Sequence, residues 1–152
     1  MKVFVLAPRE NWICDRIAKE WYENNKDVST NDPLKADVLW LLAGWCWNQV
    51  PISFLQQKKI VLTVHHIVPE KFDDRKKAEF EFRDQFVDAY HVPNEKTKDM
   101  ICGLTKKPIY VISYWYDGSF WKPQDKKTCK IRAGISEEKF ISRRSSVSSA
   151  IQ

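Results

Sequence analysis

The stretch KIVLTVHHIVPE, residues 59–70, predicts a buried strand that runs directly into two adjacent histidines. Its first six residues are mostly aliphatic and do not alternate between apolar and polar side chains. Such continuous runs are typical of strands in a parallel sheet, where helices cover both faces. Two earlier runs, KVFVLA at 2–7 and ADVLWLLA at 36–43, have the same character. The sequence therefore predicts several strands that are buried on both sides.

Helical patterns separate these runs. Residues 11–25 place aromatic and aliphatic side chains near helical spacing, with Asn11 available as an N-terminal cap. Further predictions are a short helix through Leu55, a helix over 73–88, a strand over 89–92, a helix after Asn94 that stops near Gly103, and a strand over 108–113. Alternation of this kind predicts an α/β domain: a doubly wound, mostly parallel, Rossmann-like sheet.

The chain changes character near Pro123. Residues 1–121 hold seventeen basic and seventeen acidic side chains, so the net charge of +5 arises after Trp121. We expect one Rossmann-like domain over 1–123. Residues 124–152 are expected to form a linker and a disordered tail, basic and rich in serine, because they offer little apolar surface to bury.

Composition also bears on function class and location. A basic tail on a neutral body is weak evidence for phosphate binding, so we expect no nucleic-acid partner. Four widely spaced cysteines indicate reduced thiols rather than a zinc site or disulfides. The apolar run at the N-terminus is too short for a signal peptide, and the run VLWLLAGWCW is about half a membrane span. These features predict a cytoplasmic protein, with peripheral membrane association left open.

Ligands of open parallel sheets bind beyond the carboxyl ends of the strands, where His65 and His66 fall. A neutral imidazole there can hydrogen-bond or deprotonate a hydroxyl group, so we assign His65 a catalytic role and His66 a binding role. Because neighbouring side chains of a strand point to opposite faces, only one of the two is expected to face the cleft. The alternative is a structural histidine at the end of the strand. No metal site is expected, since His91 is the one other histidine.

Two further segments lie at the same predicted edge. The loop APRENW precedes a helix, so its amides, Arg9 and Asn11 are candidates to bind an anionic or hydroxyl-rich ligand. It contains no glycine and is not a dinucleotide fingerprint. Trp45 and Trp47 follow the second strand and are candidates to stack on a ligand, with core filling as the alternative.

Three motifs together resemble the N-terminal half of a GT-B glycosyltransferase of the GT4 type. They are TVHHIVPE (63–70), VDAYHVPNEKTKDMI (87–101) and IYVISYWYDGSFWKP (109–123), in the order and on the elements typical of that family. The resemblance covers roughly residues 1–140. It implies that His65 is the acceptor-site histidine and that Asp117 belongs to the hinge between two domains. His66 stands where the family usually has Asp, and Tyr114 and Trp115 stand where it has Asn and Gly.

By this resemblance, the chain binds a sugar or another hydroxylic acceptor and needs no metal or other cofactor. The nucleotide-sugar donor is expected on a second domain that the sequence does not contain, so we expect a truncated half with little transfer activity of its own. The alternative is a non-enzymatic Rossmann-like binding module or a remnant of such an enzyme.

Overall fold

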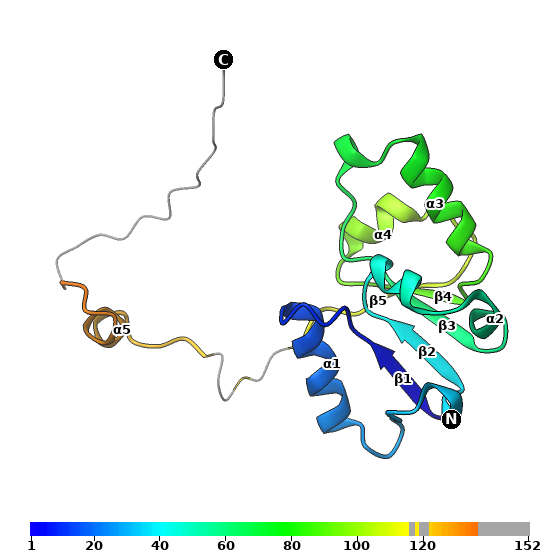
Figure 1. Ribbon diagram of the computed structural model, residues 1–152. Coiled ribbons are helices and arrows are strands. Elements are labelled where there is room, and N and C mark those ends of the chain that lie inside the picture. The colour runs from blue at the N-terminus through cyan, green and yellow to red at the C-terminus, as the bar shows by residue number, and fades with distance from the viewer. Residues whose placement is uncertain (116–117, 119–121, 137–152) are drawn as a thin grey trace. The chain divides into compact units, whose positions relative to one another are not determined.

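The computed structural model describes residues 1–115, 118 and 122–136 (Figure 1). The chain divides into two compact units, Met1–Trp115 and Tyr116–Gln152. The first unit contains the sheet and all of the predicted site residues except Asp117. The second contains one described helix, α5 (Lys126–Arg132), in the segment that the sequence predicted to be a linker. The predicted tail over 137–152 lies outside the described residues.

Within the described residues the sheet has five strands, all parallel, in the order β1-β2-β3-β4-β5. The predicted strands are present: β4 has the predicted bounds, and the other four are shorter than their apolar runs. Their bounds are β1 (Val3–Leu6), β2 (Val38–Leu41), β3 (Lys59–Thr63), β4 (Ala89–Val92) and β5 (Ile109–Val111).

Helices and 3-10 turns connect consecutive strands of the sheet. The structure confirms Asn94 as the cap of α4, where its side chain accepts a hydrogen bond from the Thr97 backbone N–H. The helical elements of the first unit are α1 (Ile13–Asn24), η1 (Pro33–Lys35), η2 (Gly44–Gln49), α2 (Ile52–Leu55), η3 (Pro69–Lys71), α3 (Asp74–Asp84) and α4 (Glu95–Ile101).

A short extended segment makes the sheet doubly wound. After α1 the chain returns along the outer edge of β1, where Val3 and Ser29 form an isolated parallel bridge. It then crosses to the other side of β1 to form β2. The direction of winding therefore reverses at β1, and the carboxyl ends of β1 and β2 flank the switch point where ligands of such sheets bind.

Side-chain contacts show that α1 and α3 cover opposite faces of the sheet. Trp21 of α1 meets Trp40 of β2 edge to face, with ring centroids 5.2 Å apart. Trp40 in turn meets His91 of β4 at 5.6 Å. The preceding residue, Tyr90, points to the other face and stacks on Phe80 of α3 at 5.4 Å. In Figure 1 the strands accordingly lie between α1 and α3.

A buried chain of hydrogen bonds crosses the face that α1 covers. The Trp40 Nε1–H donates to Thr63 Oγ1 at 2.9 Å, and Thr63 Oγ1 lies 3.0 Å from His91 Nδ1. His91 Nε2 lies 2.8 Å from the Ile112 carbonyl oxygen, which can only accept, so this nitrogen carries the proton. The polar side-chain groups of Trp40, Thr63 and His91 are thus all paired, which offsets the cost of burying them.

The prediction that Asn11 caps the first helix is wrong. The helix begins after Trp12, and Arg9 and Asn11 adopt left-handed backbone angles, with φ of 62° and 55°. Asp15 fixes this turn, because its carboxylate accepts hydrogen bonds from the backbone N–H groups of Arg9, Glu10 and Trp12 at 2.9 to 3.3 Å. Burial opposes ionisation of Asp15, but these donors lower its pKa below the ordinary value.

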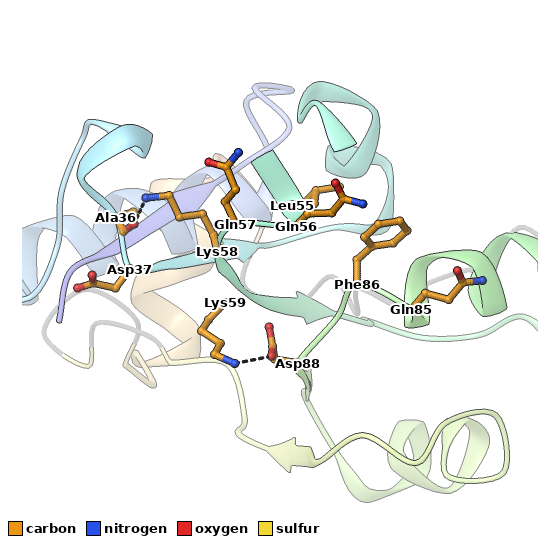
Figure 2. Close-up of a pocket in the computed structure, with 10 residues that line it drawn as sticks. All are labelled: Ala36, Asp37, Leu55, Gln56, Gln57, Lys58, Lys59, Gln85, Phe86 and Asp88. Atoms are coloured by element: carbon orange, nitrogen blue, oxygen red, sulfur yellow. Dashed lines mark hydrogen bonds and ion pairs between the residues drawn. The ribbon is translucent and has the colours of Figure 1, made fainter. Parts of the chain in front are cut away.

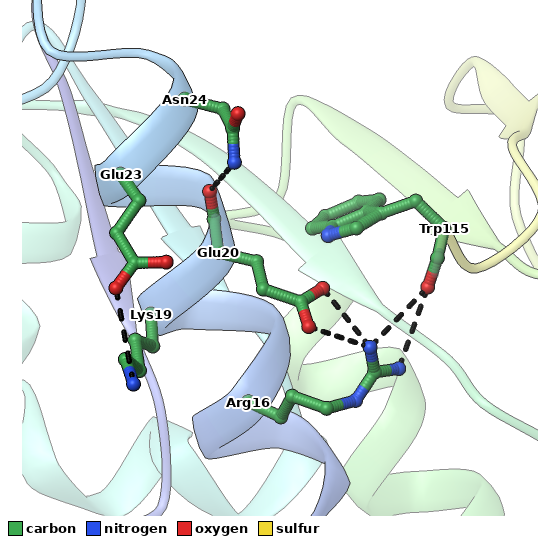
Figure 3. A network of polar contacts seen from close by, with 6 residues as sticks. All are labelled: Arg16, Lys19, Glu20, Glu23, Asn24 and Trp115. Atoms are coloured by element: carbon green, nitrogen blue, oxygen red, sulfur yellow. Dashed lines mark hydrogen bonds and ion pairs between the residues drawn. The ribbon is translucent and has the colours of Figure 1, made fainter. Parts of the chain in front are cut away.

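The end of the first unit is attached to α1 by an arginine (Figure 3). The Arg16 guanidinium binds both carboxylate oxygens of Glu20, at 2.8 and 2.9 Å. It also donates to the Trp115 carbonyl oxygen at 3.4 and 3.5 Å. The indole of Trp115 lies 6.3 Å from Trp40, so this residue completes the covering of the same sheet face.

Candidate functional site

A cleft of about 1350 Å³ opens at the carboxyl edge of the sheet. Its floor is the segment that follows β3, including His65. Its walls come from the loop before α1, from η2, and from α3. The cleft lies beside the switch point between β1 and β2, where the topology of a doubly wound sheet leaves room for a ligand.

His65 lies at the floor with protein partners on both ring nitrogens. Its Nε2 is 2.6 Å from the Leu42 carbonyl oxygen at the end of β2. Because a carbonyl only accepts, Nε2 carries the proton, and Nδ1 accepts a hydrogen bond from the Tyr114 hydroxyl. The Cys14 sulfur lies 3.3 Å from Nε2, so three elements far apart in sequence meet at this ring.

Burial keeps this group of side chains neutral. It lowers the pKa of His65, although the Leu42 carbonyl favours the charged form. Burial also raises the pKa of the Cys14 thiol, and nearby Asp15 and Glu10 raise it further. For Tyr114, burial followed by the proximity of Cys14 raises the pKa to about 12. A neutral imidazole with a lowered pKa is a weak base, so the arrangement suits hydrogen bonding to a hydroxyl better than its deprotonation.

His66 lines the cleft as well, and its side chain is exposed. The expectation that only one histidine faces the cleft assumed that the strand continues to His66. β3 instead ends at Thr63, so the strict alternation of faces no longer applies at residues 65 and 66.

The two tryptophans of η2 have different roles. Trp45 is 51% exposed, and its ring centroid lies 6.5 Å from that of His65. Trp47 is buried and packs against Phe86 at 5.8 Å, although one edge reaches the cleft. Trp45 therefore remains a candidate to contact a ligand, whereas Trp47 mainly fills the core.

Arg9 and Asn11 lie outside the lining of the cleft. Both are exposed, and Asn11 borders a smaller hollow beside α1 instead. The backbone amides of their loop, which were expected to be free for an anionic ligand, bind the Asp15 carboxylate. Asp117, the predicted hinge residue, lies outside the described residues.

Sequence reasoning missed the wall that α3 contributes. Phe80 and Phe82 line the cleft together with Lys76, Glu79 and Arg83. The signal was present, since a helix between two parallel strands must lie against the sheet. Which of its side chains line the cleft depends on how α3 packs against the rest of the unit, and that is a matter of tertiary structure.

A second hollow, of about 730 Å³, lies at the opposite edge of the sheet (Figure 2). Several of its polar groups are engaged in contacts across the amino ends of the strands. The Lys59 ammonium meets Asp88 at 3.0 Å, and the other Asp88 oxygen accepts from the Ile60 backbone N–H at 2.8 Å. Lys58 donates to the Ala36 carbonyl at 2.6 Å. These contacts hold strands together, so the carboxyl-edge cleft is the better candidate site.

No family model matches this chain, and no curated protein matches it. Among the described residues, none of the helices combines the length and apolar character needed to cross a membrane.

Proposed function

We propose that the first unit binds a hydroxylic acceptor in the carboxyl-edge cleft and acts as the acceptor half of a glycosyltransferase. The observation that carries this proposal is the His65–Tyr114 pair on the floor of a large cleft at the switch point of the sheet. The resemblance of three sequence motifs to GT4 enzymes adds the reaction class. Sugar would come from a nucleotide-sugar donor held by a second domain.

The geometry supports a role for Tyr114 between ligand and histidine. Its hydroxyl donates to His65 Nδ1, so its oxygen is left to accept a hydrogen bond from a ligand hydroxyl in the cleft. His65 then fixes the orientation of Tyr114, and the Leu42 carbonyl fixes the tautomer of His65. In this proposal His65 is a positioning residue for the acceptor, and Trp45 offers an aromatic face beside it.

The test is calorimetric titration of the purified chain with hydroxylic ligands and with their O-methyl ethers. We expect the alcohol to bind more tightly than the ether, because only the alcohol can donate to Tyr114. In Tyr114→Phe the affinity for the alcohol should fall by about fivefold to tenfold, which corresponds to one hydrogen bond. The difference in affinity between alcohol and ether should then vanish. Equal affinity of alcohol and ether in the wild type would contradict the proposal.

A nucleotide-sugar provides a second check on the assignment of this half. We expect a uridine-diphosphate hexose to show no saturable binding in the cleft and no hydrolysis by the chain alone. Robust donor hydrolysis would mean that the first unit holds a donor site, and the acceptor assignment would be wrong.

A non-enzymatic binding module is the second candidate. The observation that favours it is that both ring nitrogens of His65 have protein partners, as expected of a histidine that only stabilises the fold. The titration separates the two candidates. A module that recognises no hydroxyl would bind alcohol and ether alike, and Tyr114→Phe would change stability but not affinity.

A further inference from the structure

We infer that the ligand of the cleft is an anionic amphiphile: an extended apolar body with a hydroxyl at one end and a carboxylate or phosphate at the other. This inference rests on the proposed function, because it names the class of acceptor for the same site. Three observations support it: where the exposed apolar side chains lie, how the polar groups of the cleft are engaged, and how charge is distributed over its α3 wall.

Exposed apolar side chains are concentrated at the cleft. Ten large apolar residues among those that the structure describes are exposed, and half of them line this one cavity. They come from several elements rather than from one helix: Trp12, Trp45, Ile52, Val68 and Phe82. Apolar surface gathered in one concavity marks a binding site, whereas scattered exposed residues need no explanation.

The polar side chains of the cleft mostly serve the fold. Thr63 belongs to the buried hydrogen-bond chain, and Asn94 caps α4. Glu79 is engaged by basic side chains of α3. A free sugar would bring many hydroxyl groups into a space that offers few partners for them, and unpaired polar groups are costly to bury. A ligand with a single hydroxyl near Tyr114 and an apolar body suits these walls better.

Basic side chains outnumber acidic ones at the α3 wall. The Glu79 carboxylate is shared by Arg75, Lys76 and Arg83, with N–O distances of 2.7, 2.8 and 3.7 Å. Lys71, the last residue of η3 and close to α3 in sequence, also lines the cleft and meets no carboxylate of the described residues within ion-pair distance. The remaining carboxylate of the lining, Glu10, comes from the loop before α1, at another wall. An anionic group would therefore find complementary charge at the α3 end.

The volume also favours a ligand longer than one sugar ring. About 1350 Å³ exceeds the roughly 300 to 1000 Å³ of common small-molecule sites. The ω-hydroxy fatty acids have the inferred chemistry and can be made in graded lengths, which makes them direct probes.

The experiment is isothermal titration of the full chain with ω-hydroxy acids of six, eight, ten and twelve carbons. Each methylene that enters the cleft should tighten Kd about fourfold, until the apolar body fills it. Glucose and mannose, which carry hydroxyls without an apolar body, should bind at least about a hundredfold more weakly than the longest acid. A Kd that does not change with chain length, or a monosaccharide that binds more tightly, would overturn the inference.

Two matched pairs of variants locate the binding. Ile52→Ser should weaken binding of the longest acid by about threefold to tenfold, whereas Ile112→Ser, at an exposed isoleucine outside the cleft, should leave it unchanged. Lys71→Gln should weaken binding by about threefold and Lys77→Gln should not, because Lys77 does not line the cleft. Equal effects within both pairs would show that the acid binds elsewhere, and the inference would fail.

Failure of the inference can be told apart from failure of the proposed function. The unsubstituted fatty acid of the same length lacks the hydroxyl. If it binds as tightly as the ω-hydroxy acid while affinity still rises with length, the amphiphile site stands and the hydroxylic acceptor is wrong. If alcohols bind more tightly than their ethers but the chain length of the acid does not change Kd, the acceptor role stands and the inferred class of ligand is wrong.

Discussion

His65 is both a candidate ligand-positioning residue and part of the framework of the first unit. It links the end of β2, through the Leu42 carbonyl, to Tyr114 after β5. Loss of the hydrogen bonds of this half-buried ring should lower the stability of the fold, independently of any effect on ligand binding. Changes at this residue must therefore be measured for folding as well as for binding.

We predict that His65→Ala remains folded but loses about 1 to 3 kcal/mol of unfolding free energy, because the Leu42 carbonyl and the Tyr114 hydroxyl lose a partner. Urea denaturation followed by circular dichroism measures this loss. His66→Ala is the matched control and should change stability by less than about 0.5 kcal/mol, since its side chain is exposed. An equal loss in both variants would show that the contacts of His65 do not stabilise the fold.

Protonation of the buried histidines should make the protein sensitive to acid. Burial lowers the pKa of both His65 and His91 below the value near 6.5 of an unfolded chain. Above pH about 6.5 both states are neutral at these residues and stability is fully present. As the pH falls below that value, the unfolded chain binds protons that the folded one does not, so stability decreases by at most about 1.4 kcal/mol per pH unit for each histidine.

The measurement is the urea midpoint between about pH 7.5 and pH 5. In His91→Gln one of the two histidines no longer titrates, so the decrease in stability with falling pH should be about half as steep. A parallel decrease in wild type and variant would mean that His91 does not contribute to the acid sensitivity.

At the scale of elements, Arg16 determines how the segment after β5 lies against α1. Its guanidinium joins Glu20 to the Trp115 carbonyl. That segment also carries Tyr114, the partner of His65 in the cleft. The position of α1 and the geometry of the candidate site are therefore connected through one side chain.

We predict that Arg16→Ala increases the rate of chymotryptic cleavage at Tyr114 and Trp115 by on the order of tenfold, because one charge-assisted contact no longer holds their backbone. Limited proteolysis under native conditions measures the rate. Lys19→Ala provides the comparison: its ion pair with Glu23 is on the same helix, exposed and longer, at 3.8 Å. Comparable rates in the two variants would mean that Arg16 does not hold the segment.

At the scale of the whole molecule, the first unit has the properties of an independent domain. Its core contains aliphatic and aromatic residues from β1 to β4 and from the helices on both faces, and partly buried side chains of β5 pack against it. The first unit ends at Trp115, whereas the sequence predicted a boundary at residue 123. In the described part of the chain, β5 is the last strand of the sheet, and Trp115 is the last residue that packs on the sheet, through its contact with Trp40.

A chain that ends after Trp115 should therefore fold by itself. We expect cooperative urea unfolding, with a free energy of unfolding within about 1 kcal/mol of the full chain. The dispersion of its amide resonances in a nuclear magnetic resonance spectrum would provide an independent check. A truncated chain that unfolds without cooperativity would show that residues beyond Trp115 contribute to the core.

The sequence by itself determined the α/β class and the order of strands and helices, because continuous apolar runs and helical spacing are local signals. It also determined that residues 65 and 66 fall at the carboxyl edge, since parallel strands share that edge. The cap of α1 was predicted wrongly, because the Asp15 carboxylate binds the amides of the preceding loop and holds it in a turn, with Asn11 in a left-handed conformation and the helix beginning after Trp12.

Only the tertiary structure decided what surrounds His65. Cys14, Leu42 and Tyr114 are separated from it by 51, 23 and 49 residues, and no local pattern joins such positions. The packing of α3 likewise decided that Phe82 and Arg83 line the cleft. Local patterns arise from the backbone and burial preferences of each segment. A site depends instead on how several segments pack together, and that packing is a property of the whole fold.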